Sequence, residues 1–204
     1  MEIDKIRNNA ENYGVPIIRT ESHDFLQKIV LNEKPQNILE IGTAVGYSGI
    51  AMLSVYKNSN LTTIEHEPKL VKQAKKNFAK NGFKKQVKII EGDCLVEIAK
   101  MIASGNFDNH FDMIFLDGPK AQYNSLLELL LIVLKPNGVL VADNVLFRGY
   151  TENENLAPTK RYKTIIKRLN EFIENCKNHQ LLTDFQLNNI EDGIIFARKV
   201  QNEK

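Results

Sequence analysis

Two short apolar runs each end in a polar residue, and this pattern constrains the fold more than any other feature of the chain. Met113–Leu116 precedes Asp117, and Val139–Ala142 precedes the pair Asp143 and Asn144. Apolar runs of this length are typical of strands that are buried on both faces, as in parallel sheets. In an open α/β sheet, ligands bind beyond the carboxyl ends of the strands, so we expect these polar side chains to converge on one site.

Two carboxylates and one amide supply oxygen ligands at this predicted site. Asp117, Asp143 and Asn144 suit a hard divalent cation such as Mg²⁺ or Mn²⁺, because zinc prefers nitrogen and sulfur ligands. The loops that hold them contain no His or Cys. The alternative interpretation is turn chemistry, since Asp117 with Gly118 is a turn signal and Asp143 with Asn144 can turn the chain after a strand.

A glycine-containing turn follows another apolar run. Asn37–Ile41 leads into Gly42, and a helical pattern extends from Tyr47 to about Tyr56. Gly42 permits a tight turn and a close approach of the backbone to a ligand, and the start of the helix supplies unpaired N–H groups. A NAD-type fingerprint needs the spacing G-x-G-x-x-G, but Ala44 occupies the second glycine position, so a dinucleotide fits poorly.

Acidic residues follow the next two predicted strands. Leu61–Glu65 ends in an acid 23 positions after Gly42, near the spacing at which an acid hydrogen-bonds ribose hydroxyls. Val87–Glu91 leads to Asp93, which is placed to accept a hydrogen bond from an adenine amine. These positions favour an adenosine ligand without a pyrophosphate. The alternative for both acids is N-capping of the helices that follow, and the two roles can coexist.

Helical patterns alternate with these strands, which predicts a parallel sheet in one doubly wound domain spanning residues 1–204. The predicted helices lie at about Lys69–Asn81, Val96–Ser104, Gln122–Leu134 and Lys160–Lys177. Gly82 and Gly138 lie just beyond the ends of two of them, as helix C-caps often do. Leu181–Leu187 and Gly193–Arg198 indicate a hairpin that gives the sheet an antiparallel edge.

Composition predicts the cellular setting. The chain is 43% hydrophobic but has no apolar stretch near the length of about 20 residues that spans a bilayer. It also lacks a secretory signal at Met1, so we expect a cytoplasmic protein without a membrane partner. Cys94 and Cys176 show no C-x-x-C spacing and fit free thiols in a reducing compartment.

Three segments together resemble a known family, the class I S-adenosylmethionine-dependent, metal-dependent O-methyltransferases, which include catechol and caffeoyl-CoA O-methyltransferases. The segments are Leu39–Ser48, Phe115–Tyr123 and Ala142–Gly149, and the resemblance extends from about Val15 to Arg198. It implies the Rossmann-like α/β fold of this family, with a mostly parallel seven-stranded sheet and an antiparallel C-terminal hairpin strand. It also implies a homodimer, because relatives in this family often dimerise.

Within the family, the chain is similar to the bacterial tRNA 5-hydroxyuridine methyltransferases. The similarity rests on Gly14–Ile18, Asp143–Gly149 and Asp192–Ala197. It implies methyl transfer to the wobble 5-hydroxyuridine of a tRNA anticodon stem-loop, which gives 5-methoxyuridine. The alternatives are methylation of a small catechol-like vicinal diol and a non-catalytic adenosine-binding or RNA-binding module.

The resemblance also assigns roles to individual residues. Metal ligands fall on Asp117, Asp143 and Asn144, and cofactor contacts fall on Ile18, Gly42, Ser48, Glu65, Asp93 and Asp117. Lys120 occupies the family's catalytic-lysine position, where a nearby cation and partial burial would lower its pKa and let it act as general base. Two features depart from the family pattern. Gly118 and Pro119 replace the expected small residues, and the short segment before Val15 predicts that much of an N-terminal helix is missing.

The net charge of +2 is too small to indicate a dedicated nucleic-acid-binding protein, and no long block of like charge occurs. Basic residues do gather near the predicted mouth of the site. Arg148 follows the metal loop, and Lys160 and Arg161 begin the next predicted helix. These charges would hold the phosphates of a tRNA stem-loop, and the alternative is an ordinary solvated helix face.

Overall fold

The computed structural model describes residues 2–147, 151 and 159–201. Residue contacts divide the chain into two compact units, Met1–Glu97 and Ile98–Lys204. The boundary between the units lies within helix α5 (Cys94–Ala103).

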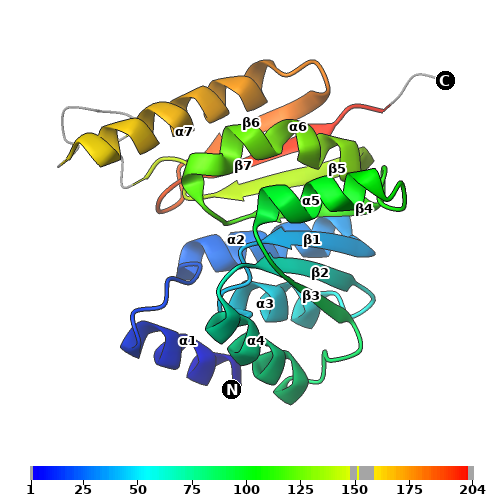
Figure 1. Cartoon of the computed structure of the whole chain (residues 1–204), viewed down its shortest axis with the longest axis vertical. Helices are drawn as coiled ribbons and strands as arrows, with labels where there is room; N and C mark the ends of the chain where they lie inside the picture. The colour runs from blue at the N-terminus through cyan, green and yellow to red at the C-terminus, as the bar shows by residue number, and fades with distance from the viewer. Residues whose placement is uncertain (1, 148–150, 152–158, 202–204) are drawn as a thin grey trace. The chain divides into compact units, whose positions relative to one another are not determined.

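The first unit contains three parallel strands in the order β3-β2-β1, with helices packed on them (Figure 1). Its elements before α5 are α1 (Glu2–Asn12), α2 (Thr20–Glu33), β1 (Asn37–Ile41), α3 (Tyr47–Val55), β2 (Asn60–Glu65), α4 (Pro68–Lys80) and β3 (Val87–Glu91). Helix α3 contacts β2, and α4 contacts both β2 and β3. The three strands and two helices that the sequence predicted in this region are therefore present.

Burial explains why α3 and α4 differ in composition. The segment Tyr47–Leu53 of α3 is buried along its whole length, so this helix has no polar face. Helix α4 instead buries Val71, Ala74 and Phe78, which share one face at i, i+3 and i+7. The opposite face of α4 is free to carry charge.

The N-terminal segment forms a helix that the sequence interpretation missed. Helix α1 spans 11 residues and buries Ile6 and Ala10, four positions apart on one face. Arg7 in the same helix donates a hydrogen bond from Nε to Tyr47 Oη at 3.0 Å. A helix is therefore present before Val15 and packs on α3, while its expected shortening relative to the family stays a prediction.

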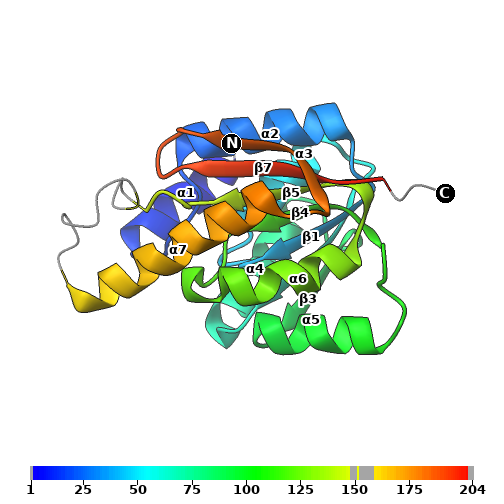
Figure 2. The same ribbon diagram turned by 90° about the horizontal axis from the view of Figure 1, so that it is seen from above.

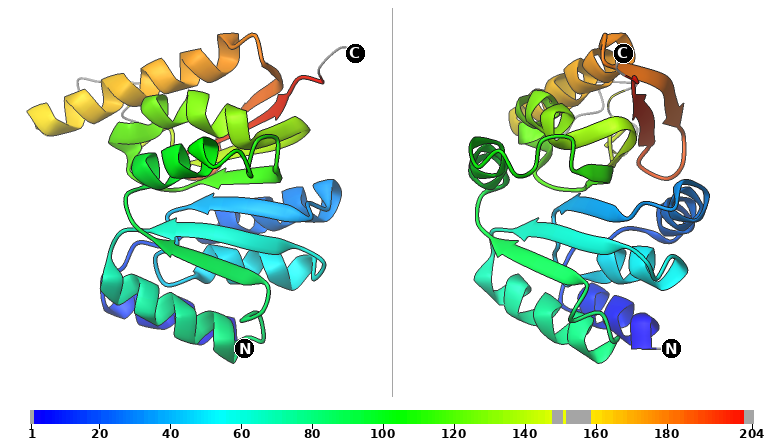
Figure 3. Two further views of the ribbon diagram at one scale, coloured as in Figure 1. Left: turned by 45° about the vertical axis from the view of Figure 1, so that its right-hand side comes forward. Right: turned by 90° about the vertical axis from the view of Figure 1, so that its right-hand side faces the viewer.

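The second unit contains strands in the order β4-β5-β7-β6 (Figure 1), with helices packed beside them (Figure 2). Its elements after α5 are β4 (Phe111–Leu116), the 3₁₀ helix η1 (Lys120–Gln122), α6 (Tyr123–Val133), β5 (Leu134–Asp143), α7 (Lys160–Asn178), β6 (Leu182–Asn188) and β7 (Ile194–Lys199). Strands β4 and β5 are parallel, whereas β7 is antiparallel to both β5 and β6. Figure 3 shows the β6–β7 hairpin that the sequence predicted.

The role of Gly138 differs from the prediction. Helix α6 ends within one residue of the predicted bound, but β5 begins at Leu134, so Gly138 lies inside the strand. A Cβ atom at position 138 would lie 2.9 Å from the carbonyl oxygen of Lys135 and 3.0 Å from that of Asp112. Gly138 is therefore needed for close backbone approach where the β4–β5 register shifts, and it does not cap a helix. The other predicted cap, Gly82, does have a left-handed φ of +84° after α4.

None of the helices in the described ranges is long and apolar enough to cross a membrane. Neither Cys94 nor Cys176 forms a disulfide bond within the described residues, as predicted, and both side chains are buried. Burial raises the pKa of the Cys94 thiol to about 11 and that of Cys176 to about 12, so both thiols stay protonated at neutral pH.

Candidate active site

Two parallel strands bring the predicted metal ligands together. Leu116 of β4 pairs with Ala142 of β5, so the next residues, Asp117 and Asp143, leave neighbouring strands at the same level. Asn144 follows with a left-handed φ of 60°, a conformation that Asn tolerates better than most residues. These three residues, with Lys120 and Tyr123, are called the carboxylate cluster below. The predicted convergence of the polar side chains in this unit is observed.

A tight turn returns Lys120 to Asp117. Pro119 precedes the 3₁₀ helix η1, and its carbonyl oxygen accepts a hydrogen bond from Gln122 N at 2.8 Å. Lys120 Nζ then donates to Asp117 Oδ1 at 2.9 Å and to the carbonyl oxygen of Asp143 at 3.3 Å. Gly118 and Pro119, which depart from the family pattern, are therefore compatible with a turn that lets Lys120 contact the ends of both strands.

Tyr123 is a member of the cluster that the sequence interpretation did not assign. It is fully buried, and its Oη accepts a hydrogen bond from Lys120 Nζ at 2.8 Å. The hydroxyl lies 3.1 Å from the carbonyl oxygen of Leu116 and 3.2 Å from that of Asp143, and it can donate its single proton to either. The ring packs edge-on against Phe172 at a centroid distance of 5.1 Å. The i, i+3 spacing of Lys120 and Tyr123 was the signal that could have revealed this contact.

Hydrogen bonds within its own loop position the Asp143 carboxylate, and hydrogen bonds to the turn before β7 position the backbone that follows it. Its Oδ1 accepts from Asn144 N and its Oδ2 accepts from Asn144 Nδ2, each at 2.8 Å. The loop continues with Val145 N donating to the carbonyl oxygen of Gly193 at 3.1 Å. Leu146 N donates to the carbonyl oxygen of Asp192 at 2.7 Å. The turn before β7 therefore fixes the backbone that follows the predicted metal ligands.

The electrostatics of the cluster fit a bound cation. Burial and the nearby charge of Asp117 raise the pKa of Asp143 to about 7, although Lys120 opposes the shift. Two carboxylates and an amide oxygen are hard ligands, and a divalent cation would favour the ionised form of both carboxylates. The Asn144 amide nitrogen already bonds Asp143, which leaves its oxygen as the atom for a cation. The donor set therefore fits Mg²⁺ or Mn²⁺.

Lys120 is held in its charged form by its neighbours. Burial alone would lower its pKa, but the charge of Asp117 and the oxygen of Tyr123 outweigh burial and raise the pKa above its ordinary value. The expected lowering of the Lys120 pKa therefore does not occur without a metal. A cation bound to Asp117 would compete for the carboxylate that produces the increase.

The first unit holds most of the predicted cofactor residues in a glycine-loop cluster, which comprises residues 40–48 with Glu65 and Asp93. Gly42 has a φ of 99°, and its N–H donates to the carbonyl oxygen of Ile64 at 3.0 Å. Ala44, also at positive φ, donates its N–H to Glu65 Oε2 at 2.9 Å. Gly46 is the N-cap of α3 with a φ of 83°, and a Cβ there would lie 2.9 Å from the ring of Phe78. Backbone conformation therefore favours glycine at both positions, and packing against Phe78 adds a second requirement at Gly46.

Ser48 contacts a buried acid that the sequence interpretation did not use. Glu40 is fully buried in β1 and accepts hydrogen bonds from Ser48 Oγ at 2.5 Å and from Thr63 Oγ1 at 2.6 Å. A charged residue inside an apolar strand was the available signal. Glu40 and its partners therefore fix the start of α3 on the strands β1 and β2.

Asp93 caps the N-terminus of the helix that follows it, as the alternative interpretation predicted. The carboxylate of Glu65 also accepts a hydrogen bond from a backbone N–H group. Asp93 Oδ1 accepts from Val96 N at 3.2 Å in the first turn of α5. Glu65 Oε1 accepts from Glu67 N at 2.9 Å, just before α4. Ile18 is buried, with 2% of its surface exposed. Contacts of Ile18, Gly42, Ser48, Glu65, Asp93 and Asp117 with a cofactor remain predictions.

A family model described as O-methyltransferase matches residues 4–200 of the chain. The chain belongs to the O-methyltransferase family. The expected enzyme class, a methyltransferase that depends on S-adenosylmethionine, is thereby confirmed at the level of the family.

Two curated members of the family show the range of similarity. The catechol O-methyltransferase of Niastella koreensis is 34% identical over 151 residues, which are 72% of this chain and 67% of that protein. The caffeoyl-CoA O-methyltransferase of Stellaria longipes is 23% identical over 202 residues, which are 96% of this chain and 82% of that protein. Similarity to these methyltransferases therefore extends over most of the chain.

Solved structures confirm the expected fold class. A Staphylococcus aureus protein proposed to be a caffeoyl-CoA O-methyltransferase is 31% identical with a TM-score of 0.89, and the match covers 98% of this chain and 92% of that chain. An O-methyltransferase from Bacillus cereus, solved with S-adenosylhomocysteine, is 22% identical with a TM-score of 0.83, covering 97% and 90%. This methyltransferase therefore has the Rossmann-like α/β fold, with a mostly parallel seven-stranded sheet and antiparallel C-terminal strands.

The predicted tRNA-binding residues of this methyltransferase lie at the edge of the described ranges. Arg148 lies outside the described residues. Lys160 and Arg161 form the start of α7, which Thr159 caps by accepting a hydrogen bond from Tyr162 N at 3.3 Å. The side chains of Lys160 and Arg161 lie outside the described part of the chain, so their role in binding tRNA remains a prediction.

Proposed function

We propose that the chain transfers a methyl group from S-adenosylmethionine to a hydroxyl of an acceptor that presents two adjacent oxygens, with a divalent cation, Mg²⁺ before Mn²⁺, in the carboxylate cluster. The observation that carries this proposal is the meeting of Lys120 with Asp117 and Asp143 at the ends of two aligned strands. Lysine, two carboxylates and an amide in one cluster suit the removal of a proton from an oxygen nucleophile.

The cation would lower the pKa of an acceptor hydroxyl near it and so generate the nucleophile at neutral pH. Asp117, Asp143 and Asn144 are the residues proposed to hold it. Lys120 is proposed to lose its own proton to solvent once a cation bound to Asp117 has lowered the pKa of the amine, and neutral Nζ would then accept the hydroxyl proton. Tyr123 is proposed to hold Nζ in place through its hydroxyl, since the tyrosine side chain is fully buried and packs against Phe172.

The glycine-loop cluster is the proposed site for the methyl donor. Its left-handed turns at Gly42 and Gly46 allow close approach to the backbone, and Glu65 and Asp93 supply acceptors for an adenosine. The family supports this cofactor, as do the relatives solved with S-adenosylhomocysteine from Bacillus cereus and with S-adenosylmethionine from Streptomyces achromogenes. We also propose that the enzyme works as a homodimer, which a mass measured by light scattering would test.

A catechol-like diol is the first candidate acceptor. The relative with 34% identity is named a catechol O-methyltransferase, and a vicinal diol can bind one cation through both oxygens. The second candidate is 5-hydroxyuridine in tRNA, whose 5-hydroxyl lies beside the carbonyl at C4 and offers a similar oxygen pair. The basic start of α7, in which residues 160–168 contain five Lys and Arg and no acid, favours this second candidate.

Transfer of label from S-adenosylmethionine tests the proposal. Simple catechol and bulk tRNA that carries 5-hydroxyuridine would be offered in parallel, with Mg²⁺ or with a chelator. Asp117→Asn should abolish the metal-dependent transfer, while Asp112→Asn, which removes an acid paired with Lys135 instead, should retain it. Label in tRNA alone selects the RNA acceptor, and label in catechol alone selects the diol. Transfer that is unaffected by chelator and by Asp117→Asn would refute the metal mechanism.

A further inference from the structure

The segment from Pro68 to Ile90 has a charge unlike the rest of the chain. It contains eight lysines and no Asp or Glu, whereas the whole chain has 27 basic and 25 acidic residues. The remainder of the chain therefore has more acids than bases. Seven of these lysines form what is called here the lysine surface: Lys69, Lys72, Lys75, Lys76 and Lys80 on α4, and Lys84 and Lys85 in the loop that follows.

The helix assembles these lysines on one side. Lys69, Lys72, Lys76 and Lys80 are spaced by three and four residues, so they lie one above another along α4. All seven side chains of the lysine surface are exposed, and none has an ion-pair partner among the described residues. Like charges at i, i+4 cost about 0.2–0.5 kcal/mol a pair in an isolated helix, so this surface stores repulsion that a bound polyanion would relieve.

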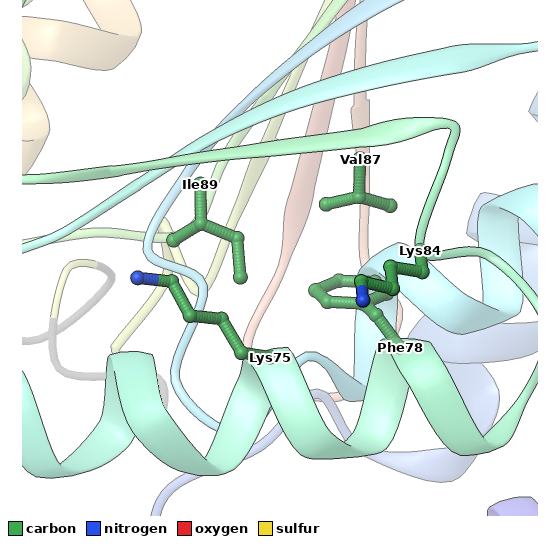
Figure 4. A pocket seen from close by; sticks show the side chains of 5 residues that line it. All are labelled: Lys75, Phe78, Lys84, Val87 and Ile89. Atoms are coloured by element: carbon green, nitrogen blue, oxygen red, sulfur yellow. The ribbon is translucent and has the colours of Figure 1, made fainter.

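A hollow beside the lysine surface has an apolar floor. It has a volume of about 270 Å³ and lies between α4 and β3, an edge strand of the sheet. Figure 4 shows Phe78, Val87 and Ile89 lining it, with the side chains of Lys75 and Lys84 at its sides. Pockets for drug-sized ligands hold about 300–1,000 Å³, so this hollow suits one flat ring system rather than a whole cofactor.

We propose that the lysine surface is a docking site for single-stranded RNA, with phosphates along α4 and one base in the hollow. A ring-sized apolar hollow flanked by two ammonium groups matches the alternation of base and phosphate in a single strand. A membrane surface fits less well, because no large hydrophobic side chain between residues 68 and 90 is among the exposed ones. A small anion would need converging lysines, whereas four of these, at positions 69, 72, 76 and 80, lie in a row along the helix.

This docking site goes beyond methyl transfer. Its use in catalysis would rest on the proposed tRNA acceptor, but RNA binding itself does not depend on the acceptor. Binding is therefore measured with a chelator and without S-adenosylmethionine, so that failure to bind RNA and failure to transfer methyl groups are separate results.

The test follows fluorescence anisotropy of a labelled single-stranded RNA of about 12 nucleotides over a range of salt concentrations. A triple variant carries the substitutions Lys72→Gln, Lys76→Gln and Lys80→Gln. It should lower the magnitude of the slope of log affinity against log salt concentration by about 2, because each phosphate contact contributes about 0.7 in a single strand. At about 0.1 M salt this corresponds to roughly a hundredfold loss of affinity. The matched control Lys28→Gln, Lys34→Gln, Lys57→Gln removes the same charge from exposed lysines elsewhere in the first unit and should change affinity less than about twofold.

Two further probes decide between RNA and other polyanions. An RNA of equal length without bases should bind about tenfold more weakly, since stacking contributes about 1–3 kcal/mol a base. Equal binding of the two RNAs would overturn the base site in the hollow. Equal losses for both triple variants, or vesicles rich in phosphatidylserine bound more tightly than RNA and released by the α4 substitutions, would overturn the RNA docking site.

Discussion

Tyr123→Phe offers a sharp test of how the carboxylate cluster works. The substitution removes Oη but keeps the ring that packs against Phe172. Lys120 Nζ then loses its 2.8 Å contact and keeps its hydrogen bonds to Asp117 Oδ1 and to the carbonyl oxygen of Asp143. The amine is left with a wider range of positions around the two strand ends.

The expected size of the effect follows from the lost hydrogen bonds. Hydrogen bonds to charged groups contribute about 1.5–3 kcal/mol, and about 1.4 kcal/mol corresponds to a tenfold change in rate. If the lower part of that range is realised only in the transition state, Tyr123→Phe should lower kcat about tenfold. The KM for S-adenosylmethionine should stay within about twofold, because the hydrogen bonds of Tyr123 are with Lys120, Leu116 and Asp143, none of which is proposed to bind the adenosine part.

Steady-state methyl transfer with each candidate acceptor measures this split between kcat and KM. Phe172→Leu serves as the matched packing variant, since it removes the edge-on ring contact and leaves the Tyr123 hydroxyl in place. It should cost about 1–3 kcal/mol of folding free energy with a smaller change in kcat. Wild-type kcat in Tyr123→Phe, or the same loss of kcat in both variants, would refute a positioning role for the hydroxyl.

Three other outcomes follow from the same unit. Lys120→Ala should lower kcat by at least about a hundredfold, while the affinity for S-adenosylmethionine, measured by calorimetry, changes little. A wild-type kcat in this variant would exclude Lys120 as the general base. Gly193→Ala places a methyl group against Leu146, at a φ of +79°, and should weaken Mg²⁺ binding. The control Gly105→Ala has a φ of +66° with open space around it, so it should cost only about 1 kcal/mol of folding free energy. Because the pKa of Asp143 is raised to about 7 in the folded protein, the metal-free protein loses stability as the pH rises from the ordinary Asp value of 3.8 through about 7. Mg²⁺ favours the ionised carboxylate, so it should raise Tm more at about pH 8 than at about pH 5.5. An equal rise in Tm at both pH values would contradict this prediction.

The carboxylate cluster was predictable because the topology of the parallel strands largely determines where its residues lie. Apolar runs before Asp117 and Asp143 indicated parallel strands, and parallel strands present their carboxyl ends at one edge. The register of Leu116 with Ala142 could not be read from the sequence, but any small shift would still have left both acids near that edge. Ligand identity was therefore accessible, whereas the hydrogen bonds of Lys120 were not.

Tyr123 and Glu40 were missed for a different physical reason. Each is a polar residue in an apolar segment, and a pattern of hydrophobic residues shows only that a position is buried. Which donor or acceptor meets the buried group depends on tertiary packing, as for Tyr123 Oη with Lys120 and Glu40 with Ser48. The same limit applies to α1, whose few apolar residues gave a weak pattern but still find partners on α3.

The lysine surface illustrates how a charge pattern can escape a linear reading of the sequence. The lysines of α4 alternate with apolar and neutral residues, so no long run of like charge exists and the net charge of +2 suggests nothing unusual. Helical periodicity separates the two sets, because Val71, Ala74 and Phe78 turn toward the sheet, whereas the lysines at positions 69, 72, 76 and 80 gather on the opposite side. A helix that needs only one apolar face to pack is free to carry a continuous charge on the other. Its fold requires the buried set alone, so the unpaired lysines call for an explanation outside folding, and binding of a polyanion is one that can be measured.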